Sequence, residues 1–336
     1  MSQVNADRIN VGMAVKVPSL TQSQINGRST QPGDIVYNST EESMQIYNGL
    51  EGQWEFIGEG SSLYDFTTAK FTPGGKSGSQ GPSLAQVRSG ISGNDGWKTD
   101  TNFLNVNAGI IEWTVPADGT YTIQVKGAQG GRSNCYGPAG GKGAELSGSF
   151  SLSAGQKLKM AIGQRGGDNC YDCGAGGGTF VCDVANQPLI IAAGGGAGSA
   201  SGYPYGGNGY HGRHDIQNGS LGYSSRPGGS NGGGGNGYGN AGGGGGLTGN
   251  GSGSWFGYSF TNGAQGRGNQ AAGGFGGGGG GGGTNGAGGG GGYSGGGATQ
   301  WSFWGAGGGS YNGGNNANGQ TGVQSNDGEI TITFNG

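Results

Sequence analysis

The sequence predicts a mainly β protein in which an antiparallel β-sandwich is interrupted by a long glycine-rich insertion. Alternating apolar and polar residues recur in short segments between residues 101 and 193, as in strands with one buried face. A similar segment, "GEITITF", closes the chain. Between them, 43 of the 85 residues from Arg226 to Ser310 are glycine, so this stretch lacks the side chains of an ordinary core.

The N-terminal region, residues 1–62, has an ordinary composition and predicts short strands between turns. In "GDIVYNSTEESMQIYNGLEGQWEFIGEG", Ile35, Tyr37, Met44 and Ile46 alternate with polar neighbours, which indicates a small β region. Such a unit is too small to bury much apolar surface by itself, and packing against copies of itself would stabilise it. We therefore expect an attachment and oligomerisation region here.

Residues 63–193 predict most of the sandwich, and residues 327–336 predict its final strand. "SLAQVRSGI" offers Ser83 as an N-cap with Gln86 three residues on, the spacing of a capping box, and we predict no other helix. Strands are predicted in "GTYTIQVKG", "GQKLKMAIGQ", "GGTFVCD" and "QPLIIAAGGG". Because both ends of the glycine-rich stretch adjoin strand-like sequence, residues 194–326 are predicted to be an insertion within the sandwich.

The glycine-rich insertion is either an ordered bundle or a slack tether. Ordering glycine opposes folding by roughly 1 to 2 kcal/mol per residue. Glycine helices of the polyproline II type, called polyglycine II, direct their N–H and C=O groups outward, so closely packed neighbours can form lateral hydrogen bonds. From Ile216 to Asn326 the only charged residues are Arg226 and Arg267, whereas linkers usually stay solvated through charge. The residues that interrupt the longest tract are expected at bundle edges or turns; they are Phe275, Thr284, Asn285, Tyr293 and Ser294.

Composition and charge exclude several classes of function. A formal charge of −3, with 16 Lys plus Arg, leaves no basic surplus for nucleic acid or for an anionic membrane surface. No run of apolar residues predicts membrane insertion, and the N-terminus lacks a secretory signal. His211, His214 and Asp215 could share a metal, but they lack a third separated ligand, so we expect a solvated loop, no metal and no cofactor. With two histidines in all and no nucleotide-binding loop, we do not expect an enzyme.

Six motifs of the chain occur in a specific order. They are "WTVPADGTYTIQVKGAQGG", "LSAGQKLKMAIGQRGG", "GAGGGTFVCDVANQPLIIAAGGGAG", "GGGGGYSGGG", "GAGGGSYNGG" and "GEITITF". This order resembles the glycine-rich domain in the ectodomains of the anaplastic lymphoma kinase receptor family, and the same arrangement occurs in many glycine-rich virion proteins of marine phages. The resemblance covers about residues 63–336. It implies a jelly-roll-like β-sandwich with an inserted polyglycine II helix bundle.

The N-terminal segments favour the virion side of this resemblance. "VNADRINVGMAVKV" and "PGDIVYNSTEESMQIYNGLEGQWEFIG" are similar to modules of cyanophage-type tail-fibre and other virion proteins. A receptor would need a signal peptide, a membrane span and a kinase. The glycine bundle also resembles the distal adhesins at the tips of T-even-like long tail fibres, in which aromatic loops between polyglycine helices bind the host surface. We therefore expect a virion protein that is made in the host cytoplasm and is extracellular after lysis.

Four cysteines, Cys135, Cys170, Cys173 and Cys182, fall within one 48-residue window. Two local disulfides suit an extracellular particle, and free thiols or a four-cysteine zinc site are the alternatives. Structural zinc usually takes two C-x-x-C pairs, whereas this chain has one. Among the three possible connectivities, our working hypothesis joins Cys135 to Cys170 and Cys173 to Cys182.

Aromatic residues cluster in turn-like segments of the glycine-rich region. They either shield the ends of the bundle or present a surface that grips glycans or protein loops. The receptor-binding candidates are Tyr203, Tyr205, Tyr210, Trp255, Phe256, Tyr258, Trp301, Phe303 and Trp304.

The sequence thus predicts a phage virion fibre or fibre-tip protein that recognises the host surface through loops on a polyglycine II scaffold. The alternative is a purely structural virion or extracellular filament subunit without a receptor-binding role. By analogy with fibres we expect a homotrimer, with other virion proteins bound through the N-terminal region. The expected target is a host surface glycan or an outer-membrane protein.

Overall fold

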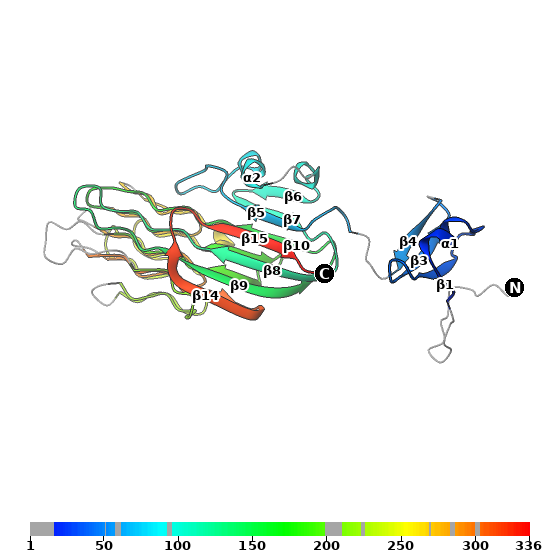
Figure 1. The fold of residues 1–336 in the computed structure, drawn as a ribbon. Helices are drawn as coiled ribbons and strands as arrows, with labels where there is room; N and C mark the ends of the chain where they lie inside the picture. The colour runs from blue at the N-terminus through cyan, green and yellow to red at the C-terminus, as the bar shows by residue number, and fades with distance from the viewer. Residues whose placement is uncertain are drawn as a thin grey trace. The chain divides into compact units, whose positions relative to one another are not determined.

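A computed structural model describes residues 17–50, 52–57, 62–92, 96–198, 210–222, 226–268, 270–282, 286–299 and 303–336. The chain divides into two compact units, residues 1–62 and residues 63–336, and each is described by itself (Figure 1). The regular secondary structure described in both units is mainly β-strand, and the strands pair antiparallel apart from one short parallel pair. The prediction of a mainly β, antiparallel fold is confirmed.

The described residues of the unit 1–62 form a four-stranded sheet and one short helix. In sheet order the strands are β1 (Ser19–Leu20), β2 (Ile35–Asn38), β3 (Ser43–Asn48) and β4 (Gln53–Ile57), and helix α1 spans Gln22–Asn26. The prediction that the chain has no helix besides the one at Ser83 is wrong. Thr21 and Gln24 form a capping box, in which Thr21 N donates to Gln24 Oε1 at 2.9 Å. Because α1 has only five residues, it is too short to show an apolar period.

The apolar residues that alternate in this sheet do not lie on its buried face. The cross-strand pairs on their face are Ile35 with Ile46 and Tyr37 with Met44. All four side chains are at least partly exposed, and Ile35 is 42% exposed. The opposite face buries Val36, Asn38 and Gln45, and Asn38 Nδ2 donates to Gln45 Oε1 at 3.4 Å. The unit therefore retains partly exposed apolar surface on one side of its sheet.

The unit 63–336 contains two antiparallel sheets that enclose one core in a β-sandwich-like arrangement (Figure 1). The first, in sheet order, is β14 (Asn315–Gln324), β9 (Gly143–Leu152), β8 (Gly119–Lys126), β15 (Glu329–Phe334) and β5 (Thr68–Phe71). The second is β13 (Tyr311–Asn312), β12 (Pro188–Ala192), β11 (Thr179–Asp183), β10 (Lys157–Ala161), β7 (Ile110–Thr114) and β6 (Leu104–Asn107). Inward side chains of both sheets, such as Trp113 of β7 and Ile123 of β8, meet in the core, because alternate residues of a strand share a face.

The described residues of this unit also form three short helical segments. They are α2 (Leu84–Gly90) and the 3-10 segments η1 (Gly96–Thr99) and η2 (Phe260–Asn262). Helix α2 begins with the predicted capping box: Gln86 N donates to Ser83 Oγ at 3.3 Å, and Ser83 N donates to Gln86 Oε1 at 2.9 Å.

Strands at the end of the chain belong to both sheets. The predicted final strand, β15, lies between β8 and β5, with Ile330 opposite Val125 and Ile332 opposite Ile123. The sequence boundary at residue 326 assigns β13 and β14 to the insertion, whereas β13 pairs with β12 and β14 pairs with β9. Strand β14 lies at a sheet edge and most of its side chains are exposed. It therefore shows none of the apolar alternation by which a half-buried strand is found.

Charged side chains form a network on the outer face of the first sheet. Glu329 of β15 lies between two lysines: its carboxylate oxygens are 2.6 Å from Lys126 Nζ and 2.5 Å from Lys70 Nζ. Burial would by itself raise the pKa of Glu329, but hydrogen bonds and charges from Lys126 and Lys70 outweigh it and lower this pKa below its ordinary value. The network joins β5, β8 and β15.

Replacing Glu329 with glutamine is expected to lower the free energy of unfolding at neutral pH by about 1 kcal/mol. A carboxyl group whose pKa is depressed in the folded state contributes stability above its unfolded pKa of about 4.3, and this contribution is lost as the pH falls through the folded pKa. The difference in the free energy of unfolding between the unchanged protein and Glu329→Gln should therefore become smaller as the pH falls. Urea titrations between about pH 3 and pH 7 test this. A difference in the free energy of unfolding that does not change with pH would contradict it.

The glycine-rich segments lie side by side and are joined by lateral backbone hydrogen bonds (Figure 1). Successive N–H groups of residues 242–247 donate to three different neighbouring segments, and the same neighbour returns every third residue. In order, these bonds are Gly242 to Gly280 (3.0 Å), Gly243 to Ser252 (3.0 Å), Gly244 to Gly296 (2.9 Å), Gly245 to Gly277 (2.7 Å), Gly246 to Gly249 (2.8 Å) and Leu247 to Tyr293 (2.8 Å). We call this array, formed by the described residues between 226 and 310, the glycine lattice.

Strands of the sandwich continue directly into the glycine lattice. Gly194, two residues after β12, donates its N–H to Gly291 O at 2.8 Å and accepts from Gly308 N at 3.0 Å. Ala128, two residues after β8, likewise accepts from Gly195 N at 2.9 Å. The lattice and the sandwich are therefore parts of one compact unit.

The runs of glycine in the lattice have a steric cause. A Cβ atom added to Gly244 would lie 2.0 Å from Gly290 O, one added to Gly235 would lie 2.0 Å from Gly296 O, and one added to Gly290 would lie 2.3 Å from Gly194 O. Neighbouring carbonyl groups thus occupy the space that a side chain would need. Glycine is required here for close approach of the backbones.

The residues expected at lattice edges or turns divide into three cases. Thr284 and Asn285 lie outside the described residues. Phe275 begins a turn that continues through Gly276 and Gly277, whose φ angles are 97° and 81°, and its ring is fully buried. Tyr293 lies at a bend and its ring packs 5.1 Å from that of Tyr311, whereas Ser294 is buried and forms an isolated β-bridge with Gly309.

Candidate functional site

The aromatic candidates from the sequence fall into two groups and a remainder. Tyr203, Tyr205 and Trp301 lie outside the described residues. One group consists of Trp255, Phe256 and Tyr258, and the other of Tyr210, Phe303 and Trp304.

The first group surrounds a cation of its own chain. The Arg267 guanidinium carbon lies 5.9 Å from the ring centre of Trp255, 5.1 Å from that of Phe256 and 5.7 Å from that of Tyr258. All three rings are half-buried. Cation–π contacts of this kind contribute roughly 0.5–1 kcal/mol at exposed sites. This group therefore contacts one of the two charged residues of the glycine lattice.

The other charged residue of that region is held in the same way. The Arg226 guanidinium carbon lies 4.2 Å from the ring centre of Tyr238. The glycine lattice contains no carboxylate, and aromatic faces lie against both of its cations.

The second group combines an exposed ring with a fixed backbone. The ring of Tyr210 is 5.8 Å from that of Trp304, edge to face, and Phe303 is 6.4 Å from Trp304. Tyr210 N donates to Gly305 O at 3.0 Å, and Gly196 N donates to Tyr210 O at 2.8 Å. The lattice thus fixes the main chain of Tyr210, whereas its side chain remains 45% exposed.

A surface depression of about 560 Å³ lies beside Tyr210. The segment 210–221 and strand β14 form it. We call it the Tyr210 depression, and the residues that line it are Tyr210, His211, Arg213, Ile216, Gly219, Ser220, Leu221 and Thr321. None of these described lining residues is a carboxylate.

The ring of His211 has a defined orientation and tautomer. Its Nδ1 accepts a hydrogen bond from Lys142 N at 2.9 Å, so Nδ1 carries no proton and Nε2 carries the N–H. The ring atoms Cγ and Cδ2 of His211 lie 2.4 and 2.6 Å from where a Cβ of Gly322 would stand, so the ring packs directly on that glycine. Burial, with the nearby charge of Lys142, lowers the pKa of His211. At neutral pH the imidazole is a neutral donor through Nε2.

The other polar groups of the "YHGRHDIQ" segment pair with protein atoms. Arg213 and Asp215 form a bidentate pair, with Nε 2.9 Å from Oδ1 and Nη2 2.6 Å from Oδ2. His214 Nδ1 lies 2.8 Å from Thr321 Oγ1. The three residues weighed as metal ligands thus have separate partners, and the described part of the chain contains no cluster of three or more His, Cys, Asp or Glu side chains suited to a metal.

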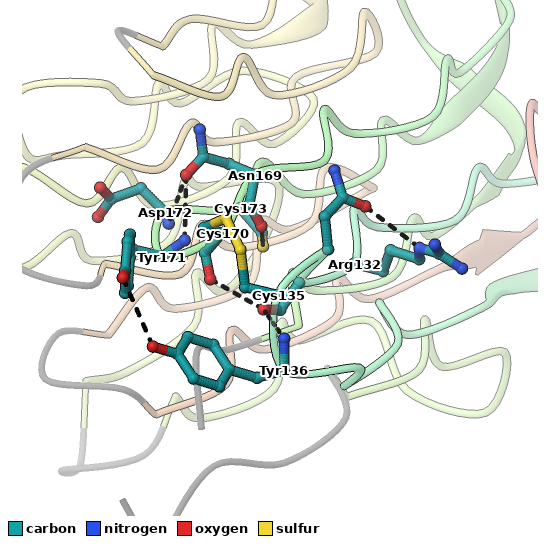
Figure 2. The surroundings of a disulfide bond; sticks show 10 residues. Arg132, Cys135, Tyr136, Asn169, Cys170, Tyr171, Asp172 and Cys173 are labelled. Atoms are coloured by element: carbon teal, nitrogen blue, oxygen red, sulfur yellow. Dashed lines mark hydrogen bonds between the residues drawn. A yellow bond between two sulfur atoms is a disulfide. The ribbon is translucent and has the colours of Figure 1, made fainter. Parts of the chain in front are cut away.

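A disulfide joins Cys135 to Cys170 and ties the loop 132–139 to the loop 168–173 (Figure 2). The second bond of the working hypothesis is absent, because Cys173 and Cys182 are free. Cys182 lies on β11 among Phe180 and Ile191, whereas Cys173 packs in a separate cluster of alanines. Sequence spacing does not show that these two cysteines belong to different clusters.

The two free thiols are expected to resist alkylation in the native protein. Burial raises the pKa of Cys173 to about 12 and also raises the pKa of Cys182, so the reactive thiolate is scarce at neutral pH. Iodoacetamide should therefore modify neither thiol before unfolding. In denaturant without reductant it should modify these two and leave Cys135 and Cys170 intact, as checked by mass spectrometry. Rapid modification of Cys173 in the native protein would contradict the structure.

One exposed aromatic pair is not predicted from the sequence. Tyr136 and Tyr171 each follow a cysteine of the disulfide; their ring centres are 5.8 Å apart and their hydroxyl oxygens 3.5 Å apart (Figure 2). They are 41% and 46% exposed. The sequence analysis considers aromatic clusters within the glycine-rich region, whereas this pair comes from two segments brought together by the disulfide.

Comparison with known proteins adds no family assignment, since no protein-family model matches the chain. Among the described residues no helix is long and apolar enough to span a membrane.

Proposed function

We propose that this chain is a fibre or fibre-tip protein of a phage virion that recognises the host surface through loops carried on a polyglycine II scaffold. The observation that carries this proposal is the three-residue repeat of lateral hydrogen bonds in the glycine lattice. Polyglycine II has three residues per turn and leaves its backbone groups free for neighbouring helices. Neighbouring carbonyl groups lie where Cβ atoms added to these glycines would stand. This further supports the conformation, because only chains without side chains approach so closely.

Such a scaffold suits recognition because it fixes loop positions before binding. Tyr210 illustrates this, since its main chain is hydrogen-bonded into the lattice and its ring is exposed. Preorganised aromatic side chains lose little conformational entropy on binding. The partner in this proposal is a host surface glycan or an outer-membrane protein. The Cys135–Cys170 bond suits a protein that works outside the reducing cytoplasm, as a virion protein does after lysis.

The unit 1–62 has the proposed role of attachment to other virion proteins and assembly into a homotrimer. Support comes from the partly exposed pairs Ile35 with Ile46 and Tyr37 with Met44, since exposed apolar surface on a small sheet is stabilised by packing against another copy. Light scattering of the purified chain gives its mass in solution. A stable monomer would overturn this part of the proposal.

Two measurements test the main proposal. Gold-labelled antibody against the chain should decorate fibre tips of intact particles from a lysate that contains it. The purified, fluorescently labelled chain should bind the bacteria that these particles infect and should compete with infection. Binding to those cells that is no greater than to resistant mutants of the same strain would overturn the recognition role.

A structural role without receptor binding is the second candidate. It is favoured by the contacts of Arg267 with Trp255, Phe256 and Tyr258, since these rings are already occupied by the chain itself. Under this alternative, antibody decorates the particle but the chain does not bind the cells.

A further inference from the structure

The Tyr210 depression has the volume of a small-ligand site. Its volume of about 560 Å³ lies within the roughly 300–1,000 Å³ range of ligand pockets. One wall is the segment 210–221 and the other is Thr321 of β14. Backbone bonds fix the segment: Gly212 N donates to Lys142 O at 2.9 Å, and Ser220 N donates to Gly307 O at 3.0 Å.

Apolar surface lies open to solvent at this place. Tyr210 is 45% exposed and Leu221 is 61% exposed, and half-buried Ile216 lies between them in sequence. An exposed ring beside aliphatic groups suits a ligand that has one apolar face. The C–H face of a sugar ring is such a surface.

The polar groups at the depression are mostly donors and hydroxyls. Nε2–H of His211 is fixed by the bond that Nδ1 accepts from the main chain. Arg213 uses Nε and Nη2 on Asp215, and the described residues supply no partner for its Nη1. Ser220 and Thr321 add hydroxyl groups. Hydroxyl-rich ligands are bound by such mixed donors and acceptors.

The charge of the depression argues against an acidic ligand. The bidentate partner Asp215 neutralises Arg213, His211 is a neutral donor, and Lys142, whose charge lies near His211, does not line the depression. Recognition of a phosphate, sulfate or carboxylate instead calls for uncompensated cations in a forked arrangement.

We propose that the Tyr210 depression binds a neutral hexose unit of a surface glycan. The C–H face of the sugar lies on Tyr210 and Leu221, and its hydroxyl groups bond with His211 Nε2 and Arg213 Nη1. This inference rests on the proposed function and names its ligand class and its site.

The test uses the full chain and free sugars. D-glucose, D-galactose, D-mannose and N-acetyl-D-glucosamine are the neutral probes, N-acetylneuraminic acid is the acidic probe, and binding is followed by saturation-transfer NMR and calorimetry. At least one neutral probe is expected to bind. Tyr210→Ala and Leu221→Ala should each weaken that binding about tenfold or more, whereas Tyr210→Phe should keep most of it because the ring remains.

Tyr136→Ala is the matched control, because it removes another exposed tyrosine that lies outside the depression. It should bind the sugar as the unchanged chain does, and thermal unfolding verifies that all variants are folded. The inference is overturned if no neutral sugar binds, if Tyr210→Ala binds unchanged, or if the acidic probe binds more tightly. If the chain binds the host cells but no neutral sugar, the inference of a sugar site is wrong and the proposed function stands. If it binds a neutral sugar but not the host cells, the proposed host recognition is wrong instead.

Discussion

Replacing Gly244 with alanine is expected to lower the free energy of unfolding of the unit 63–336 by about 3–5 kcal/mol, a large effect for one methyl group. The new Cβ would lie 2.0 Å from Gly290 O, far inside contact distance. Gly244 N donates to Gly296 O and Gly290 N donates to Ala306 O. Moving either segment aside therefore breaks lateral bonds worth about 0.5–1.5 kcal/mol each, and overpacking adds about 1–3 kcal/mol.

The sign of this effect distinguishes the lattice from a slack tether. In a tether, alanine would only reduce the freedom of the unfolded chain and would be neutral or stabilising by about 0.4–1 kcal/mol. Gly96→Ala is the matched control, since no atom lies within 4 Å of its added Cβ, and its expected change is within about 0.5 kcal/mol. Guanidinium titrations compare the variants. Equal midpoints for Gly244→Ala and Gly96→Ala would refute the lattice.

Strands with one buried face could be predicted from the sequence because their apolar side chains alternate. Ile330 and Ile332 of β15 face the core, and Thr331 between them does not. The same logic fails where no face is buried, as in β14, or where the buried positions are polar, as with Asn38 and Gln45 in the N-terminal sheet. The period of apolar residues indicates which face of a strand is buried, and it does not by itself indicate which backbones pair.

The candidate site could be predicted only in part. Tyr210 is predicted as an aromatic residue of the glycine-rich region. Leu221 belongs to the same segment but is not aromatic, and Thr321 is distant in sequence and becomes a neighbour of Tyr210 through β14. The sequence also cannot distinguish aromatic rings that contact other side chains of the protein from rings that are accessible to a ligand. Trp255 and Tyr210 have similar surroundings in sequence, yet Arg267 lies near the ring of Trp255 while Tyr210 adjoins an open depression.

Phe275 connects the glycine lattice to the sandwich. Its side chain is fully buried in a cluster with Phe180 of β11, Ile191 of β12 and Phe260 of η2. Its main chain is also held, since Phe275 N donates to Gly78 O at 2.8 Å and Phe275 O accepts from Gln164 N at 2.8 Å. The lattice thus places the rings of Phe275 and Phe260, with Leu247, against the outer side of the second sheet. In a region held largely by backbone bonds, these side chains form a hydrophobic anchor of which Phe275 is a fully buried part.

Phe275→Ala is therefore expected to destabilise the unit 63–336 by about 3–5 kcal/mol, the usual cost of removing a buried phenylalanine ring. Val184→Ala, at a 57% exposed side chain, is the control and should change stability by about 0.5 kcal/mol or less. Because the ring touches both lattice and sheet, hydrogen exchange should quicken in residues 274–278 and in β11 and β12 together. If only the lattice amides lost protection, the lattice would unfold separately from the sandwich, and the anchoring role of Phe275 would be wrong.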